Sequence, residues 1–202
     1  EHTAIAGGKK NWTSGDATAI CGGKENMTYG EATSISGGKE NIAGSDDPDQ
    51  DGATEAASIT GGKNNWAVGE ATAICGGNMN EAIGDATTVS GGKMNKAKGV
   101  ASSVAGGEGN VADAEAASVA GGKGNHVTGK YAAIAGGKEK TMETEGGVKA
   151  GEEDFVPPTG PGQDFCETAT CGNTCTTMNS CEAAGCSWLG GPGVTEGYLC
   201  NP

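Results

Sequence analysis

The chain has 202 residues, of which 39 are glycine and only 4% are aromatic, and its formal net charge is −13. So strong a negative charge opposes contact with a phosphate backbone, and we expect no nucleic-acid partner. No apolar run approaches about 18 residues, so we expect no segment that spans a membrane.

A Gly-Gly pair recurs through residues 1–143 and divides them into units of constant length. The step between pairs is 15 residues, except for one step of 24 that carries an insertion of nine residues. So strict a period is typical of repeat proteins in which each unit is one coil of a solenoid. The pairs are Gly7-Gly8, Gly22-Gly23, Gly37-Gly38, Gly61-Gly62, Gly76-Gly77, Gly91-Gly92, Gly106-Gly107, Gly121-Gly122 and Gly136-Gly137.

Each unit shows the same order of residue types when position 1 is set at Gly15, which places the Gly-Gly pair at positions 8 and 9. Position 6 is always Ile or Val, and positions 3 to 5 and 7 are almost all small. Alternation predicts strands over positions 3–7 and 12–14, with positions 4, 6, 12 and 14 inward and position 13 outward. Glycines at positions 1, 8 and 9 suit corners that need a positive φ.

The predicted fold class is therefore all-β. It is a parallel β-solenoid (a β-roll) of about nine 15-residue coils, followed by a small disulfide-rich module. The glycine density argues against helices in these units.

Position 12 is Asn in eight of nine units and predicts a ladder of side-chain amides inside the coil. Stacked asparagines about 4.8 Å apart can satisfy one another's donors and acceptors. The alternative is that position 12 only needs a residue that tolerates left-handed backbone at a turn. The column contains Asn11, Asn26, Asn41, Asn65, Asn80, Asn95, Asn110 and Asn125.

Positions 5 and 7 predict a flat outward face that a second copy covers. Each coil buries one large aliphatic side chain, so its interior is thin, and small side chains on this face allow two backbones to approach closely. We therefore expect a homotrimer or a filament. Cys21 and Cys75 either are buried there as small apolar residues or cross-link neighbouring copies. The face contains Ala19, Cys21, Ser34, Ser36, Ser58, Thr60, Ala73, Cys75, Thr88, Ser90, Ser103, Ala105, Ser118 and Ala120.

The insertion at residues 44–52 carries the pattern Asp-x-Asp-x-Asp-Gly. Alternating carboxylates converge when a loop curls, and hard oxygen ligands suit Ca²⁺, so we expect a structural calcium site. The alternative is a solvated acidic loop. The expected ligands are Asp47, Asp49, Asp51, the carbonyl group of Ala53 and Glu55.

The repeat fades after residue 143, where residues 144–163 predict a cap and a Gly/Pro linker, and residues 164–202 a cysteine-rich module. Six cysteines in so short a segment predict three disulfides and favour an extracellular setting. Trp188 and Tyr198 either stack on a sugar ring or form the small core of this module. Residues 185–188 (Gly-Cys-Ser-Trp) resemble PSI-type modules of cell-surface receptors. The six cysteines are Cys166, Cys171, Cys175, Cys181, Cys186 and Cys200.

The unit Gly-x-Ala-Thr-Ala-Ile-Cys-Gly-Gly-x-x-Asn-x-Thr-x resembles the head repeat of trimeric autotransporter adhesins over residues 1–143. The resemblance implies a left-handed parallel β-roll, three chains side by side and adhesion at a cell surface. Residues 144–202 depart from that family, because they show no coiled-coil stalk or membrane-anchor barrel. A disulfide module is also foreign to it and indicates a eukaryotic secreted protein. The matching strand residues are Thr18-Ala19-Ile20, Ala73-Ile74 and Ser103-Val104.

The sequence contains no nucleophile elbow, phosphate loop or zinc motif, so we expect no enzymatic activity. The first hypothesis is an extracellular structural or adhesive protein that self-associates side by side or end to end into a rod or filament. The second is a carbohydrate-binding protein in which the solenoid is a spacer for the cysteine-rich module. Besides further copies of the chain, the expected partners are surface glycans or other matrix proteins. The third is an ice-binding solenoid, in which Thr, Ser and Ala at position 4 order water.

Overall fold

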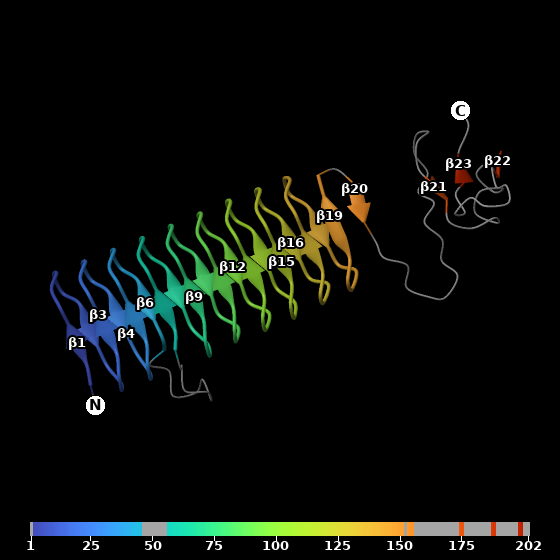
Figure 1. Ribbon diagram of the computed structural model, residues 1–202. Helices are drawn as coiled ribbons and strands as arrows, with labels where there is room; N and C mark the ends of the chain where they lie inside the picture. The colour runs from blue at the N-terminus through green and yellow to red at the C-terminus, as the bar shows by residue number, and fades with distance from the viewer. Residues whose placement is uncertain are drawn as a thin grey trace, which may run out of the picture. The chain divides into compact units, whose positions relative to one another are not determined.

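The computed structural model shows a regular stack of short parallel strands over the repeat region (Figure 1). It describes residues 2–45 and 56–151, together with the backbone of strands at 153–155, 174–175, 187–188 and 198–199. The chain divides between residues 156 and 157 into two compact units, and each is described by itself. No helix occurs in this described part. The prediction of an all-β parallel solenoid of about nine coils is confirmed.

Positions 5 and 6 of each coil contribute a strand to an eleven-stranded sheet. Its repeat strands pair in parallel and in register, as Ile5 does with Ile20. The strands are β1 (Ala4–Ile5), β3 (Ala19–Ile20), β5 (Ser34–Ile35), β7 (Ser58–Ile59), β9 (Ala73–Ile74), β11 (Thr88–Val89), β13 (Ser103–Val104), β15 (Ser118–Val119), β17 (Ala133–Ile134), β19 (Val148–Ala150) and β20 (Glu153–Phe155). Strand β20 pairs antiparallel with β19 and ends this sheet.

Positions 13 and 14 contribute a strand to a second, nine-stranded parallel sheet, which we call the outer sheet. Its strands are β2 (Trp12–Thr13), β4 (Met27–Thr28), β6 (Ile42–Ala43), β8 (Trp66–Ala67), β10 (Glu81–Ala82), β12 (Lys96–Ala97), β14 (Val111–Ala112), β16 (His126–Val127) and β18 (Thr141–Met142). The second unit contains an antiparallel sheet of β21 (Thr174–Cys175), β23 (Tyr198–Leu199) and β22 (Ser187–Trp188).

The observed strands are shorter than the predicted spans, because the chain turns within a few residues on either side of them. Non-glycine residues at positions 3 and 11 adopt left-handed backbone, as Ala71 does with a φ of 55° and Met79 with a φ of 56°. Such residues bend the chain before each strand. Between the two strands, a single bridge at position 10 continues the parallel stacking, for example from Lys63 to Asn78.

The insertion leaves the stacking register unchanged. Ile35 pairs with Ile59 in the first sheet, and Ile42 pairs with Trp66 in the outer sheet, although 24 residues separate the partners. The coils on either side of the insertion therefore stack as other neighbouring coils do.

The interior contains columns of identical or similar side chains from positions 4, 6 and 14. The Ile and Val side chains at position 6 are fully buried from Ile20 to Ile134, and small residues at position 14 pack against them. Position 4 points inward as well, because it has the same parity as position 6. The prediction that position 4 points inward is confirmed, so these residues do not face water as an ice-binding face would require. The buried residues in question are Thr18, Thr33, Ala57, Thr72, Thr87, Ser102 and Ala117.

The asparagines at position 12 bond each coil to the coils on both sides of it. Asn80 is completely buried, and its Nδ2 donates hydrogen bonds to the carbonyl of Gly76 in its own coil and of Gly92 in the next, at 2.9 and 3.1 Å. Its Oδ1 accepts a hydrogen bond of 3.0 Å from the backbone N–H of Asn95. All the hydrogen-bonding groups of the buried amide thus find partners in backbone or ladder atoms.

The ladder runs mainly through backbone groups, which differs from the amide-to-amide bonding that the sequence suggested. Direct bonds between side-chain amides join Asn26 to Asn11, Asn41 to Asn26 and Asn65 to Asn41, each beside a bond from the backbone N–H. From Asn80 onward, the ladder bonds that link one asparagine to the next use the backbone N–H alone. The alternative explanation of position 12 is wrong, because left-handed φ angles fall at position 11.

The two glycines of each pair have different structural roles. At Gly77 the φ is 90°, and an added Cβ would collide with the carbonyl oxygen of Gly92 and the amide of Asn80. At Gly76 the φ lies outside the left-handed region, and an added Cβ would meet nothing within 4 Å. The same open space adjoins position 8 in all nine units. The expected positive φ therefore holds for position 9 and is wrong for position 8. At position 1 it holds for Gly15, Gly30 and Gly69 and is wrong for Gly84, Gly99 and Gly129.

We predict that Asn80→Ala lowers the free energy of unfolding by about 3 kcal/mol, because it leaves the carbonyl of Gly76 and the N–H of Asn95 without partners. The carbonyl of Gly92 loses one of its two hydrogen bonds and keeps the one from the N–H of Asn78. The matched control is Asn78→Ala at position 10, which should change the free energy of unfolding by less than about 0.5 kcal/mol. Denaturant unfolding followed by circular dichroism measures both, and equal losses would contradict this account of the ladder.

We also predict that Gly77→Ala destabilises the solenoid by at least about 2 kcal/mol, since it combines backbone strain with a collision. The neighbouring Gly76→Ala should be neutral within about 0.5 kcal/mol in the dissociated chain. Thermal unfolding of the two variants at high dilution provides the comparison, and a large loss for Gly76→Ala would show that the chain itself requires this glycine.

Candidate functional site

The outward positions of the first sheet form a surface without bulky or charged side chains, which we call the small-residue face. It consists of positions 5, 7 and 8 of the coils. At position 5 the side chains are half-buried, apart from the exposed Ser34; they are Ala19, Ser34, Ser58, Ala73, Thr88, Ser103 and Ser118. At position 7 all are exposed: Cys21, Ser36, Thr60, Cys75, Ser90, Ala105 and Ala120.

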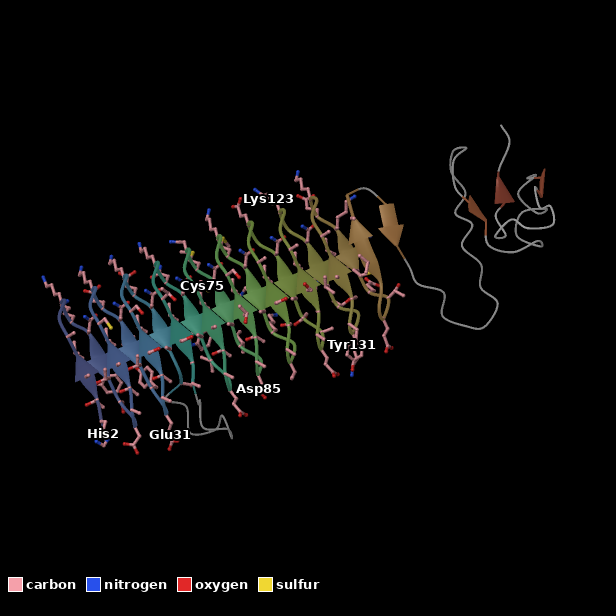
Figure 2. The ribbon with its side chains drawn as sticks, in the orientation of Figure 1. His2, Glu31, Cys75, Asp85, Lys123 and Tyr131 are labelled. Atoms are coloured by element: carbon pink, nitrogen blue, oxygen red, sulfur yellow. The ribbon has the colours of Figure 1, made fainter. Side chains whose placement is uncertain are left out.

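The two cysteines of the repeat region lie on this face with free, exposed thiols. Their interpretation as buried small residues is wrong for the single chain, because position 7 points outward. Cys75 lies in the middle of the solenoid, away from the charged side chains at its margins (Figure 2). Both thiols are therefore accessible to reagents, or to another molecule that covers the face.

Position 8 is glycine in every unit, although the chain's own structure does not require it. The backbone there avoids the left-handed region, and open space lies where a side chain would project. Position 13 on the outer sheet has equally free space outside the coil and holds residues as different as Trp66, Lys96 and Val111. The restriction on size is thus specific to the small-residue face and does not come from contacts within the chain.

A basic edge runs along one side of the small-residue face. We define it by positions 10 and 11, which together contain eight lysines and four glutamates. The edge therefore has a formal surplus of four positive charges. The lysines are Lys9, Lys10, Lys24, Lys39, Lys63, Lys93, Lys123 and Lys138. The glutamates are Glu25, Glu40, Glu108 and Glu139.

An acidic edge runs along the other side. We define it by positions 15 and 1 to 3, which contain eight carboxylates and two lysines among the described residues. The edge therefore has a formal surplus of six negative charges. Figure 2 shows Glu31 and Asp85 at this edge and Lys123 at the opposite one. The carboxylates are Asp16, Glu31, Glu70, Asp85, Asp113, Glu115, Glu143 and Glu145, and the lysines are Lys98 and Lys130.

Ion pairs within each edge link the minority charges to neighbours in the same coil, as between Lys39 and Glu40, or in adjacent coils. Lys123 lies 3.1 Å from Glu108, and its hydrogen bond, with the nearby charge of Lys93, lowers the pKa of Glu108. At the acidic edge Lys130 and Tyr131 approach Glu115 to 3.0 and 2.9 Å and lower the pKa of Glu115. These groups are exposed, so solvent screens the pairs.

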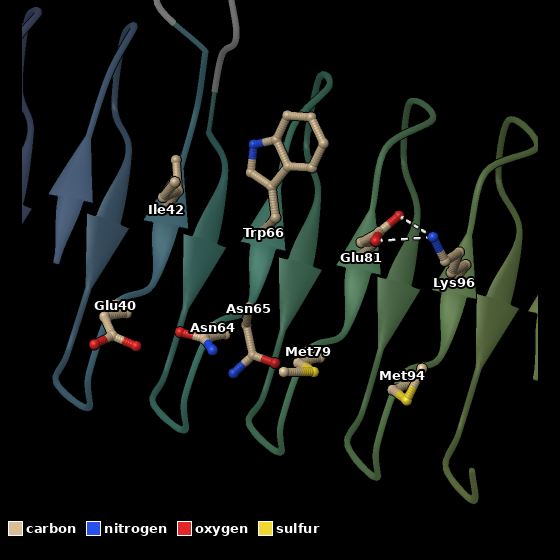
Figure 3. Close-up of a pocket in the computed structure, with 9 residues that line it drawn as sticks. All are labelled: Glu40, Ile42, Asn64, Asn65, Trp66, Met79, Glu81, Met94 and Lys96. Atoms are coloured by element: carbon tan, nitrogen blue, oxygen red, sulfur yellow. Dashed lines mark hydrogen bonds and ion pairs between the residues drawn. The ribbon is translucent and has the colours of Figure 1, made fainter. Parts of the chain in front are cut away.

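The outer sheet carries a shallow groove of about 490 Å³ around Trp66 (Figure 3). The indole of Trp66 is 40% exposed, and Met79 and Met94 add apolar surface. Glu81 and Lys96 form an ion pair of 2.8 Å at one end. The sequence places Trp66 at an outward position, but it does not show that side chains from positions 11 and 13 of several coils combine into one groove.

The predicted calcium ligands Asp47, Asp49, Asp51, Ala53 and Glu55 lie outside the described residues. Of the module's six cysteines, only the backbone of Cys175, in β21, is described, and the backbones of Trp188 and Tyr198 pair in β22 and β23. Within the described residues, no three His, Cys, Asp or Glu side chains gather as metal ligands would, and no helix is long and apolar enough to cross a membrane.

No protein-family model matches the chain, and a search of curated proteins finds no matching relative.

Proposed function

We propose that the solenoid is a self-associating module of an extracellular structural or adhesive protein, and that copies pack side by side through the small-residue face. The observation that carries this proposal is the row of glycines at position 8, which the chain itself does not need. A row without side chains lets a second backbone approach closely. The absence of charge from the fourteen residues at positions 5 and 7 removes the desolvation cost that charged groups would add.

The shape of the face suits lateral contact. Nine coils at about 4.8 Å per coil give a flat strip roughly 40 Å long. Covering it would shield the thin interior, in which one Ile or Val per coil is the largest buried aliphatic side chain over most of the stack. End-to-end growth is less well supported, because the antiparallel β20 closes one end of the first sheet.

Two further features of the sequence support the biological setting in this proposal. The six cysteines of residues 164–202 favour an oxidising, extracellular environment. The resemblance of the repeat to adhesin heads favours three copies around a common axis and a role in adhesion at a cell surface.

We predict that Ala105→Arg abolishes or strongly weakens self-association, because a long charged side chain would have to be buried between two sheets. The matched control is Val111→Arg on the outer sheet, which should leave association unchanged. Native mass measured by light scattering, over a range of protein concentrations, distinguishes them. A monomeric wild-type chain, or equal behaviour of the two variants, would overturn the proposal.

The exposed thiols supply an independent measurement on the unmodified chain. We predict that Cys21 and Cys75 react with a maleimide at high dilution and become protected as the concentration rises, because the partner copy covers position 7. Peptide mass spectrometry separates these two sites from the other six cysteines. Constant reactivity across the concentration range would place the contact on another surface.

The groove around Trp66 favours glycan binding as a second candidate function. An exposed indole offers an apolar face to a sugar ring, and the carboxylate of Glu81 and the amide of Asn64 can bond hydroxyl groups. We expect Trp66→Ala to remove glycan-array signals that Trp12→Ala retains, since Trp12 lies in the same column but outside the groove. Equal signals from both variants and the wild type would exclude the groove as the site.

A further inference from the structure

We infer that the two charged edges fix the orientation of the associated copies, which lie parallel, with the basic edge of one copy against the acidic edge of the next. This inference rests on the proposed function, because it takes the small-residue face as the contact surface. It adds the partner chemistry of the margins: a row of carboxylates opposite a row of ammonium groups.

The charge distribution of the coils is the first line of evidence. Residues 2–45 and 56–151 contain thirteen lysines and thirteen carboxylate side chains, so the described coils are formally neutral. The chain's net charge of −13 therefore comes from the remaining residues. Within this neutral body, the charges are separated to opposite margins of one face. Neutrality allows copies to approach, and the separation makes the approach directional.

In-register stacking places like charges next to one another within each edge. Position 10 of four successive coils is occupied by Lys9, Lys24, Lys39 and Lys63. Parallel backbone bridges pair each of these lysines with the next. Like charges directly opposite in a parallel ladder repel one another. Lys63 has no ion-pair partner among the described residues, and the same holds for Glu31 and Glu70 at the acidic edge. A facing row of opposite sign would relieve this repulsion.

The geometry of a face bounded by unlike edges then selects the orientation. Two copies related by a two-fold axis along the solenoid bring each basic edge against an acidic edge. A two-fold axis across the face, which makes the copies antiparallel, brings basic against basic and acidic against acidic. Copies arranged cyclically around an axis parallel to their solenoids also bring unlike edges together. Charge complementarity therefore favours every parallel arrangement over the antiparallel one.

Charge reversals at the basic edge, at the acidic edge and at both edges together test this inference. One variant carries Lys9→Glu and Lys63→Glu, a second carries Glu31→Lys and Glu70→Lys, and a third carries all four changes. The control carries Lys96→Glu and Lys140→Glu, which alter net charge as the first variant does but lie at positions 13 and 12. Circular dichroism first establishes that each variant is folded, and light scattering then gives the association constant.

We predict that each single-edge variant associates at least about tenfold more weakly than wild type, because the attraction between the edges falls. The formal charge of the basic edge falls from +4 to 0 in the first variant, and that of the acidic edge from −6 to −2 in the second. The variant with all four changes should associate no more tightly than the first variant, since its two edges carry formal charges of only 0 and −2. The control should match wild type. In about 1 M salt, where the Debye length is roughly 3 Å, the differences between the variants should shrink.

The alternative results separate the two proposals. If wild type assembles and the single-edge variants assemble as well as the control, the edges do not direct the contact, and the small-residue face remains the contact surface. A single-edge variant that associates more tightly than wild type would indicate antiparallel copies and overturn the inference. If the variant with all four changes associates as tightly as wild type, attraction between unlike edges does not orient the copies, and the inference is overturned. A wild-type chain that stays monomeric overturns the proposed function itself.

Discussion

The structure depends on the requirement that every coil match the next coil residue for residue. The buried amide of Asn80 imposes it, because this side chain bonds to Gly76 in its own coil, Gly92 in the following coil and the backbone of Asn95. A one-residue slip would break these bonds and turn each inward side chain to the surface. The interior is thin, so this hydrogen-bonded column carries the specificity that a large apolar core supplies in globular domains.

A constant register turns a short sequence pattern into continuous surfaces. One residue type at one position becomes a column along the solenoid, whether it is the Ile of the interior, the Gly of position 8 or the Lys of position 10. Columns of apolar or amide groups stabilise the stack, whereas columns of like charge oppose it. The separation of lysines and carboxylates to two margins therefore destabilises the single chain. This repulsion is the physical basis of the inference that the unlike edges of two copies meet.

The two sheets use the same backbone arrangement but differ in the side chains they accept. The outer sheet accepts Trp66, Lys96 and Val111 at equivalent positions, as expected for a surface that faces solvent. The small-residue face accepts nothing larger than threonine at positions 5 and 7 between Ala19 and Ala120. No atom of the chain lies within 4 Å of an added Cβ at Gly76, so contacts within the chain do not impose the glycine at position 8 of this face.

The sequence by itself determined the coil length, the β-class of the fold and the inward column of Ile and Val, because a strict 15-residue period with alternating polarity leaves few other structures. It did not determine which glycine of each pair is structurally required, how the buried amides are bonded or whether Cys21 and Cys75 are exposed. Those properties depend on where the neighbouring coil places its carbonyl groups and on how sharply positions 3 and 11 turn. Sequence spacing identifies the residues that stack, but only the tertiary structure decides which atoms meet and which side of the coil is left uncovered.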